Sequence, residues 1–188
     1  MKNAIILHGM PTKEEYEDPT AQHYRKHWMP WLKGQLESAG IPTEMPLFPE
    51  PYAPDYEKWL AVFEKLTVNE NTLLIGHSCG GGFLVRWLSE NPVRVSKVAL
   101  VAPWIDPSHA YAPKMFNDLH IEPALLDRTE ALRVFFSTDD DKEIYDSLEE
   151  LKRALPGLDV QEFIDKGHFT RHDMKTEEFP ELRDFLLS

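Results

Sequence analysis

Short apolar runs recur along the chain and alternate with segments of helical spacing. The runs, most of them uninterrupted, lie at residues 4–8, 45–48, 72–77, 97–102, 132–137 and 159–164. Uninterrupted apolar runs of this length are typical of strands that are buried on both faces of a sheet. Between the runs, apolar residues recur three or four positions apart, as in Trp28, Trp31, Leu32 and Leu36. This alternation predicts an α/β fold in which helices cover both faces of a parallel sheet of about six strands.

We expect residues 1–188 to form a single domain, because no repeat, low-complexity tract or linker divides the chain. Two proline-rich stretches, at 48–56 and 102–126, interrupt the alternation and are predicted to be loops. Both would leave strands at their carboxyl ends, which is where open parallel sheets bind ligands. The two loops are therefore expected to wall a site.

Charge and cysteine content restrict the partners and the compartment. The chain carries 20 Lys and Arg against 32 Asp and Glu, a formal net charge of −12, which argues against nucleic acid and anionic membranes as partners. No apolar run approaches the roughly 18 residues of a membrane span, and the amino-terminal run is too short for a signal peptide. The single cysteine fits a reducing compartment. We expect a complete, cytoplasmic protein.

The third apolar run leads into the segment LLIGHSCGGGF at residues 73–83, which places four glycines around one serine. Within it, residues 76–80 match Gly-x-Ser-x-Gly, the nucleophile elbow. The serine of this motif occupies a strained strand-to-helix turn that projects its hydroxyl clear of the sheet. Glycine is needed two residues to either side, because a side chain there would collide with the neighbouring strand or helix. We therefore predict that Ser78 is a nucleophile at the start of a helix.

A serine nucleophile needs a base and an orienting acid, and both follow later strands in the order expected for this architecture. Three aspartates at residues 139–141 follow the fifth run, and His168 follows the sixth. A histidine with a pKa near 6.5 accepts the serine proton, while a carboxylate fixes its tautomer. We predict that His168 is the base and that one of the three aspartates is the acid.

Backbone N–H groups beside the serine are expected to stabilise the oxyanion formed during acyl transfer. One is the amide of Cys79, at the start of the helix that follows Ser78. The other is the amide of Met10 in the segment HGMP at 8–11, where Gly9 permits a close approach. Cys79 is also an alternative nucleophile by residue type, but its side chain is expected to point away from the position of Ser78 Oγ.

Residues near the predicted reacting centre are candidates for substrate contact. They are Gly9, His77, Trp104, Met115 and Phe169. For the last three, which flank strand ends, simple hydrophobic packing explains the sequence equally well.

Two histidine pairs, His23 with His27 and His168 with His172, have the four-residue spacing of a helical metal site. Neither pair belongs to a His-Glu-x-x-His motif, and no second cysteine completes a zinc cluster. The segment 23–31 more simply opens a helix whose aromatic residues pack on the sheet. We expect neither a metal nor another cofactor.

These motifs together resemble those of the α/β-hydrolases, and more narrowly those of the small, single-domain serine hydrolases that include retinoblastoma-binding protein nine and bacterial YdeN. The resemblance spans nearly the whole chain and rests on an immediate first strand, LIGHSCGG, STDD at 137–140 and GHF at 167–169. It implies a fold without a cap domain, with Ser78 as nucleophile, His168 as base and Asp140 as acid. Relatives usually have proline after that aspartate, whereas Asp141 follows here, so Asp139 stays open as the alternative.

The leading prediction is a serine hydrolase that forms an acyl-enzyme from small acyl substrates, with carboxylic esters as the first substrate class. A site without a cap is expected to be shallow, which disfavours long lipids. The same residues suit amide or peptide hydrolysis, and the fold also suits a non-catalytic protein-binding module. The sequence specifies neither the natural substrate nor a protein partner.

Overall fold

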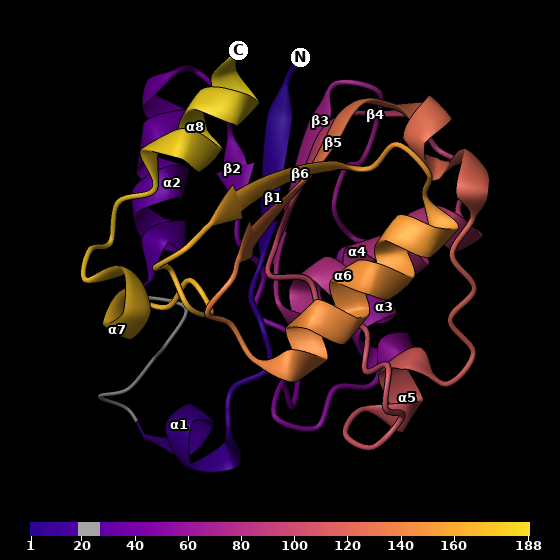
Figure 1. Ribbon diagram of the computed structural model, residues 1–188. Coiled ribbons are helices and arrows are strands. Elements are labelled where there is room, and N and C mark those ends of the chain that lie inside the picture. The colour runs from indigo at the N-terminus through magenta and orange to yellow at the C-terminus, as the bar shows by residue number, and fades with distance from the viewer. Residues whose placement is uncertain (19–26) are drawn as a thin grey trace.

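The computed structural model describes residues 1–18 and 27–188, which contain a six-stranded, all-parallel sheet (Figure 1). The strand order is β2-β1-β3-β4-β5-β6. The strands are β1 (Asn3–Leu7), β2 (Thr43–Glu44), β3 (Thr72–His77), β4 (Val95–Val101), β5 (Thr129–Ser137) and β6 (Asp159–Phe163). The predicted α/β architecture is therefore confirmed.

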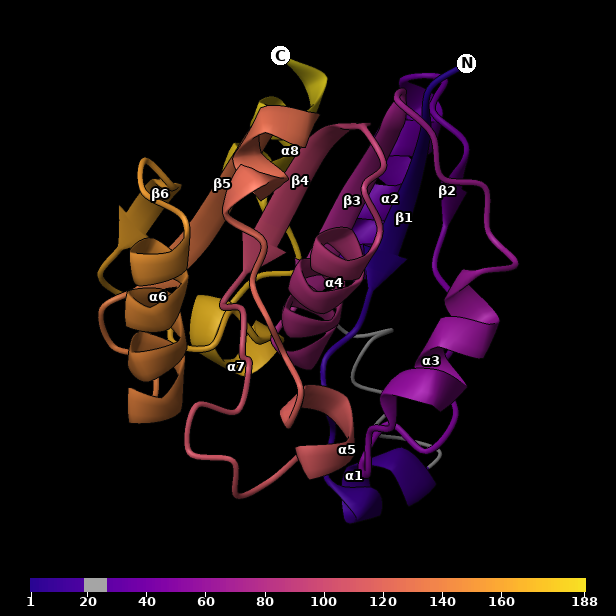
Figure 2. The same ribbon diagram turned by 90° about the vertical axis from the view of Figure 1, so that its right-hand side faces the viewer.

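Helices cover both faces of this sheet. They are α1 (Lys13–Glu17), α2 (Trp28–Ser38), α3 (Tyr56–Phe63), α4 (Cys79–Glu90), α5 (Pro113–Phe116), the 3₁₀ helix η2 (Pro123–Arg128), α6 (Lys142–Ala154), α7 (Arg171–Met174) and α8 (Pro180–Leu187). Helices α2 and α8 lie together on one face, and α3, α4 and α6 lie on the other (Figures 1 and 2). The short helices α1 and α7 follow β1 and β6, so they lie beyond the carboxyl ends of the strands, where Figure 1 shows them.

The continuous apolar runs form the centre of the sheet as predicted. Every residue of β3 and β4 is buried, because these strands have neighbours on both edges and helices on both faces. The edge strand β6 is only partly buried.

The strand predicted at 45–48 is wrong. The structure instead pairs Thr43 and Glu44 with Ala4 and Ile5 of β1. Pro46 has no N–H to donate to a strand ladder, so the pairing ends before it. The next residues leave the sheet, with Leu47 exposed and Phe48 buried.

The covering helix predicted over 23–31 is seen from Trp28, with His27 as its N-cap. Trp28 and Met29 are buried in the core as expected. Residues 23–26, including His23, lie outside the described part of the chain. In the described part, none of the helices has both the length and the apolar character needed to cross a membrane.

Two glycines in helices give a matched test of this packing. A Cβ on Gly82 of α4 would lie 2.0 Å from the carbonyl oxygen of Trp104, whereas a Cβ on Gly34 of α2 would meet no atom within 4 Å. We expect Gly82→Ala to lower the free energy of unfolding by about 1–3 kcal/mol or more through overpacking. We expect Gly34→Ala to raise it by about 0.5–1 kcal/mol through helix propensity. Urea unfolding measures both, and a Gly82→Ala protein as stable as the wild type would contradict the packing described here.

Candidate active site

Ser78 occupies a strained turn between β3 and α4. It has φ 52° and ψ −121°, a left-handed conformation that residues with a Cβ rarely adopt. Hydrogen bonds hold the turn: the Ser78 N–H donates to the carbonyl of Val101, and the Ser78 carbonyl accepts from the N–H groups of Gly82 and Trp104. The main chain of Ser78 is thus fixed by β4, by α4 and by the loop after β4.

The glycines that flank Ser78 are required by close contacts. A Cβ on Gly76 would lie 2.6 Å from the carbonyl oxygen of Gly80, and a Cβ on Gly80 would lie 2.4 Å from the carbonyl oxygen of His8. Both distances are far shorter than a van der Waals contact. The structure therefore agrees with the steric reason given for the Gly-x-Ser-x-Gly spacing.

The ring of His168 contacts Asp140. The distances from Nδ1 of His168 to the two carboxylate oxygens of Asp140 are 3.0 and 3.1 Å. The Asp140 side chain is 1% exposed and that of His168 is 30% exposed. A buried carboxylate therefore holds Nδ1, while the ring stays accessible from the cavity.

Asp139 has a different set of contacts. Its Oδ1 accepts hydrogen bonds from the Ser137 hydroxyl, at 2.6 Å, and from the Gly167 N–H, at 2.9 Å. The hydrogen bond from Ser137 and that from Gly167 lower the pKa of Asp139. Asp139 thus ties the end of β5 to the loop that carries His168, and the structure shows Asp140, the second aspartate, against the ring.

Asp173 holds the loop on the carboxyl-terminal side of His168. Oδ2 of Asp173 accepts hydrogen bonds from the His168 N–H, at 3.2 Å, and from the Thr170 hydroxyl, at 2.7 Å. Thr170 in turn caps α7 in a capping box with Asp173. Phe169, which lies between His168 and Thr170, has φ 54° and stacks on Phe179 in the core. Hydrogen bonds and core packing therefore hold the loop on both sides of His168.

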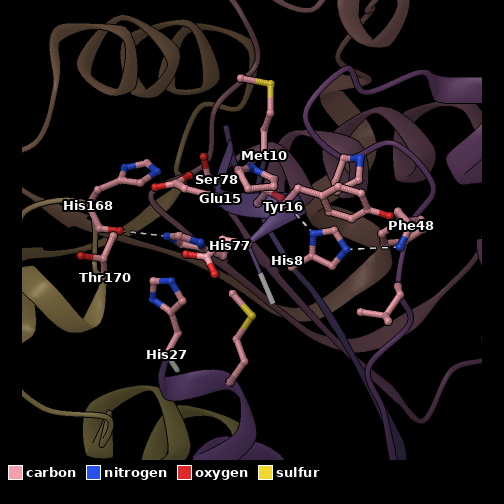
Figure 3. A pocket seen from close by; sticks show the side chains of 16 residues that line it. His8, Met10, Glu15, Tyr16, His27, Phe48, His77, Ser78, His168 and Thr170 are labelled. Carbon is pink, nitrogen blue, oxygen red and sulfur yellow. Dashed lines mark hydrogen bonds between the residues drawn. The ribbon is translucent and has the colours of Figure 1, made fainter. Parts of the chain in front are cut away.

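Ser78 and His168 line one cavity of about 430 Å³, within the range typical of small-molecule sites (Figure 3). Residues from the turn after β1, from α1, the start of α2, the loop after β2, the elbow and the loop after β6 form its walls. They are His8, Gly9, Met10, Pro11, Glu15, Tyr16, Asp18, His27, Met29, Leu47, Phe48, Pro51, His77, Ser78, His168 and Thr170. The predicted contacts at Gly9, Met10 and His77 thus lie at the cavity.

Part of the predicted wall lies elsewhere. The loop at 48–56 contributes Phe48 and Pro51, as expected, but none of the described lining residues comes from 102–126. Trp104 and Met115 are buried in the core on the α4 side, where the Trp104 ring packs edge-on against Phe116. Phe169 is fully buried against other phenylalanines. The prediction that Trp104, Met115 and Phe169 line the pocket is wrong for this cavity, because their apolar side chains pack into the core.

His8, which precedes Gly9 in the segment HGMP, lines the cavity and is a site residue that the sequence did not identify. The ring is buried, its Nε2 accepts a hydrogen bond from the Phe48 N–H at 3.2 Å, and its Nδ1 lies 2.8 Å from the Gly9 carbonyl. Since Nε2 accepts, the proton of the neutral ring is on Nδ1 and is donated to Gly9. Burial lowers the pKa of His8, and the hydrogen bond to Gly9 partly offsets this effect. His8 thus joins the turn after β1 to the loop after β2.

Cys79 is fully buried at the start of α4. Burial, together with the negative charge of Asp106, raises the pKa of its thiol, which keeps the sulfur protonated and weakly nucleophilic. Its side chain does not line the cavity. These facts agree with the expectation that Cys79 is not the nucleophile.

Of the two histidine pairs with helical spacing, one includes His23, which lies outside the described residues. His27 lines the cavity and His172 is exposed on α7. Among residues 1–18 and 27–188, no three His, Cys, Asp or Glu side chains are placed so that they could hold a metal ion.

Comparison with known proteins places this site in context. YdeN of Bacillus subtilis (strain 168) is 36% identical over 95 residues, which cover 50% of this chain and 45% of YdeN. The alignment therefore spans less than half the length of that relative. The solved structure of the ydeN gene product has a TM-score of 0.78 at 22% identity and covers 100% of this chain and 97% of that chain.

More distant structures share the fold. FphF, described as a fluorophosphonate-binding serine hydrolase of Staphylococcus aureus, has a TM-score of 0.61 at 12% identity, with coverage of 100% of this chain and 84% of that chain. The serine hydrolase family matches residues 20–187, nearly the whole chain. With its six-stranded α/β-hydrolase fold and its serine on the elbow, the chain belongs to the serine hydrolase family.

Proposed function

We propose that Ser78, His168 and Asp140 form a catalytic triad that hydrolyses small carboxylic esters through an acyl-enzyme. The proposal rests on the contact between Asp140 and Nδ1 of His168. The His168 ring lines the same cavity as Ser78. The order of the three residues along the chain is that of the α/β-hydrolases.

In this proposal each group has a defined role. Asp140 accepts a hydrogen bond from the N–H at Nδ1 of His168, which leaves Nε2 of the neutral ring as the base for the Ser78 hydroxyl. Ser78 Oγ attacks the ester carbonyl, and His168 then returns the proton to the leaving alcohol. Water, activated by the same ring, releases the acid from the acyl-enzyme. The carboxylate of Asp140 stabilises the imidazolium that forms in each step.

Two backbone amides are proposed to stabilise the tetrahedral oxyanion. The Cys79 N–H lies in the first turn of α4, where helical N–H groups have no intrahelical acceptor. Met10 lies in the turn after β1, and Gly9 beside it is so close to Ser78 that a Cβ there would lie 3.0 Å from Ser78 Cβ. The two segments that carry these amides therefore meet at the serine. Each such donor contributes about 10²–10³ in rate.

The cavity walls favour an apolar substrate group of moderate size. Apolar side chains from three segments face it, and they are Met10, Met29, Leu47, Phe48 and Pro51. A volume of about 430 Å³ accommodates more than an acetyl group. We therefore expect esters with medium-length or aromatic groups to react faster than acetate esters.

A fluorophosphonate probe tests the proposal directly. The probe should label the protein once, and peptide mapping by mass spectrometry should place the label on Ser78. A panel of p-nitrophenyl esters of increasing acyl length, run beside aminoacyl p-nitroanilides, then defines the substrate class. Faster turnover of the esters supports the proposal, and comparable turnover of the anilides would replace it with amide hydrolysis. A protein that neither reacts with the probe nor cleaves either panel would be better explained as a binding module.

A further inference from the structure

His77 lies between two parts of the site that the chain brings together from far apart. It is the last residue of β3 and directly precedes Ser78, and its ring is buried at the cavity. Its Nε2 lies 2.8 Å from the carbonyl oxygen of His168, the contact drawn as a dashed line beside His77 in Figure 3. On the opposite side of the ring, a Cβ on Gly9 would lie 3.3 Å from Nδ1. One side chain therefore forms a hydrogen bond with the main chain of one neighbouring segment and lies close to the other.

The hydrogen bond fixes the tautomer of this ring. A carbonyl oxygen only accepts, so Nε2 of His77 carries the proton and donates it to His168. The titratable groups that face the ring are His168, His27 and His8. Burial, and then the proximity of His168 and of His27, hold the pKa of His77 well below its usual value. The ring consequently stays neutral, with its donor on Nε2, under the conditions in which His168 acts as a base.

The hydrogen bond from His77 adds to those that hold the loop of His168. This loop lies between β6 and α7 without regular structure, and it includes Phe169 in a left-handed conformation. Asp173 accepts from the His168 N–H, and Asp140 contacts the ring. The carbonyl of His168 is the one remaining polar group of this residue's main chain, and its partner is His77. The carbonyl of His168 is therefore held by His77, the residue next to the proposed nucleophile Ser78.

We infer that His77 is a positioning residue, which fixes the distance between the main chains of Ser78 and His168 by its hydrogen bond to the His168 carbonyl. The inference rests on the proposed function, because it concerns the geometry of that triad. His77 precedes Ser78 by one residue, so the hydrogen bond links the nucleophile and the base by a path of few rotatable bonds. A residue without the donor would remove this direct link, while the hydrogen bonds of the loop to Asp139 and Asp173 would remain.

The variants His77→Gln and His77→Asn isolate the donor. Both remove the ring, but the glutamine amide reaches the position of Nε2 and the asparagine amide does not. We expect His77→Asn to have a kcat, and a rate constant for labelling by the fluorophosphonate probe, about tenfold below those of His77→Gln, the effect of one hydrogen bond. The KM values of the two should be similar, because both lose the same wall of the cavity. Thermal unfolding of both variants separates this effect from a loss of folded protein.

The outcomes separate this inference from the proposed function. Equal labelling rates for the two folded variants would overturn the positioning role even if Ser78 is the nucleophile. If the wild type is not labelled, the proposed function fails instead. Nitrogen-15 NMR of the ring in the unmodified protein gives a test that no variant can compromise. A neutral His77 with the proton on Nε2 from about pH 6 to pH 8 supports the inference, and a proton on Nδ1 or a charged ring overturns it.

Discussion

Replacing Ser78 by alanine should abolish ester hydrolysis. The change removes the hydroxyl that forms the acyl-enzyme, and the loss of kcat expected for a triad serine is about 10⁶-fold. Alanine has the same Cβ as serine, so it can occupy the strained turn at φ 52° about as well as the native residue. We therefore expect Ser78→Ala to fold like the wild type, and to be inert in both a p-nitrophenyl ester assay and fluorophosphonate labelling.

Ser89 provides the matched control for this variant. It is a half-buried serine near the end of α4 that does not line the cavity, and its hydroxyl donates to the Val85 carbonyl and accepts from the Glu122 N–H. Ser89→Ala should retain wild-type turnover and wild-type labelling, with a loss of stability from the two missing hydrogen bonds. A Ser78→Ala protein that still becomes labelled would place the nucleophile on another residue and would end the proposed mechanism.

The elbow could be predicted from the sequence because its sequence pattern is local: a buried strand, glycines at 76 and 80, and a following helix are contiguous in the chain. The contact that requires Gly76 lies within this segment, at Gly80, whereas the contact that requires Gly80 is with His8, after the neighbouring strand β1. The position of His168 followed from strand order alone, because the carboxyl ends of parallel strands share one edge of the sheet.

The cavity walls could not be predicted in the same way. Whether Trp104 lies at the cavity or in the core depends on which side chain its ring packs against. That side chain is Phe116, in α5, a helix that the sequence pattern did not define. Met29 reaches the cavity because α2 packs against β1, a contact between segments that are distant in the sequence. Local patterns predict that these apolar side chains are buried, but they do not predict on which side of the sheet.

The role of His8 shows the same limit. The dipeptide of His8 and Gly9 marked a close approach of the chain, but the hydrogen bond from the Phe48 N–H depends on where the loop after β2 turns. That loop was predicted to begin after a strand at 45–48, whereas β2 ends at Glu44. An error of a few residues in one strand therefore concealed a contact that orders the turn carrying Met10.

Replacing Asp140 by asparagine should reduce kcat by about 10⁴-fold while leaving the fold intact. Asparagine has nearly the same shape, but its amide carries no charge to stabilise the imidazolium and does not enforce the proton on Nδ1 of His168. The KM for an ester should change little, because Asp140 is buried behind the ring and does not line the cavity. The measurement is steady-state hydrolysis of a p-nitrophenyl ester across pH, with the circular dichroism spectrum as a check on folding.

Asp139→Asn is the control that decides between the two aspartates, because Asp139 contacts Ser137 and Gly167 rather than the ring. We expect a loss of kcat of at most about tenfold, since the loop of His168 keeps its other hydrogen bonds.

The main effect of Asp139→Asn should be on stability. The pKa of Asp139 is lowered in the folded protein, so its carboxylate stabilises the fold above about pH 4 and loses that contribution as the pH falls through the lowered pKa. Asp139→Asn should therefore be less stable than the wild type at neutral pH and should approach it in strong acid. If Asp139→Asn instead proved to be the inactive variant and Asp140→Asn the active one, the contact between Asp140 and His168 would not be the catalytic one.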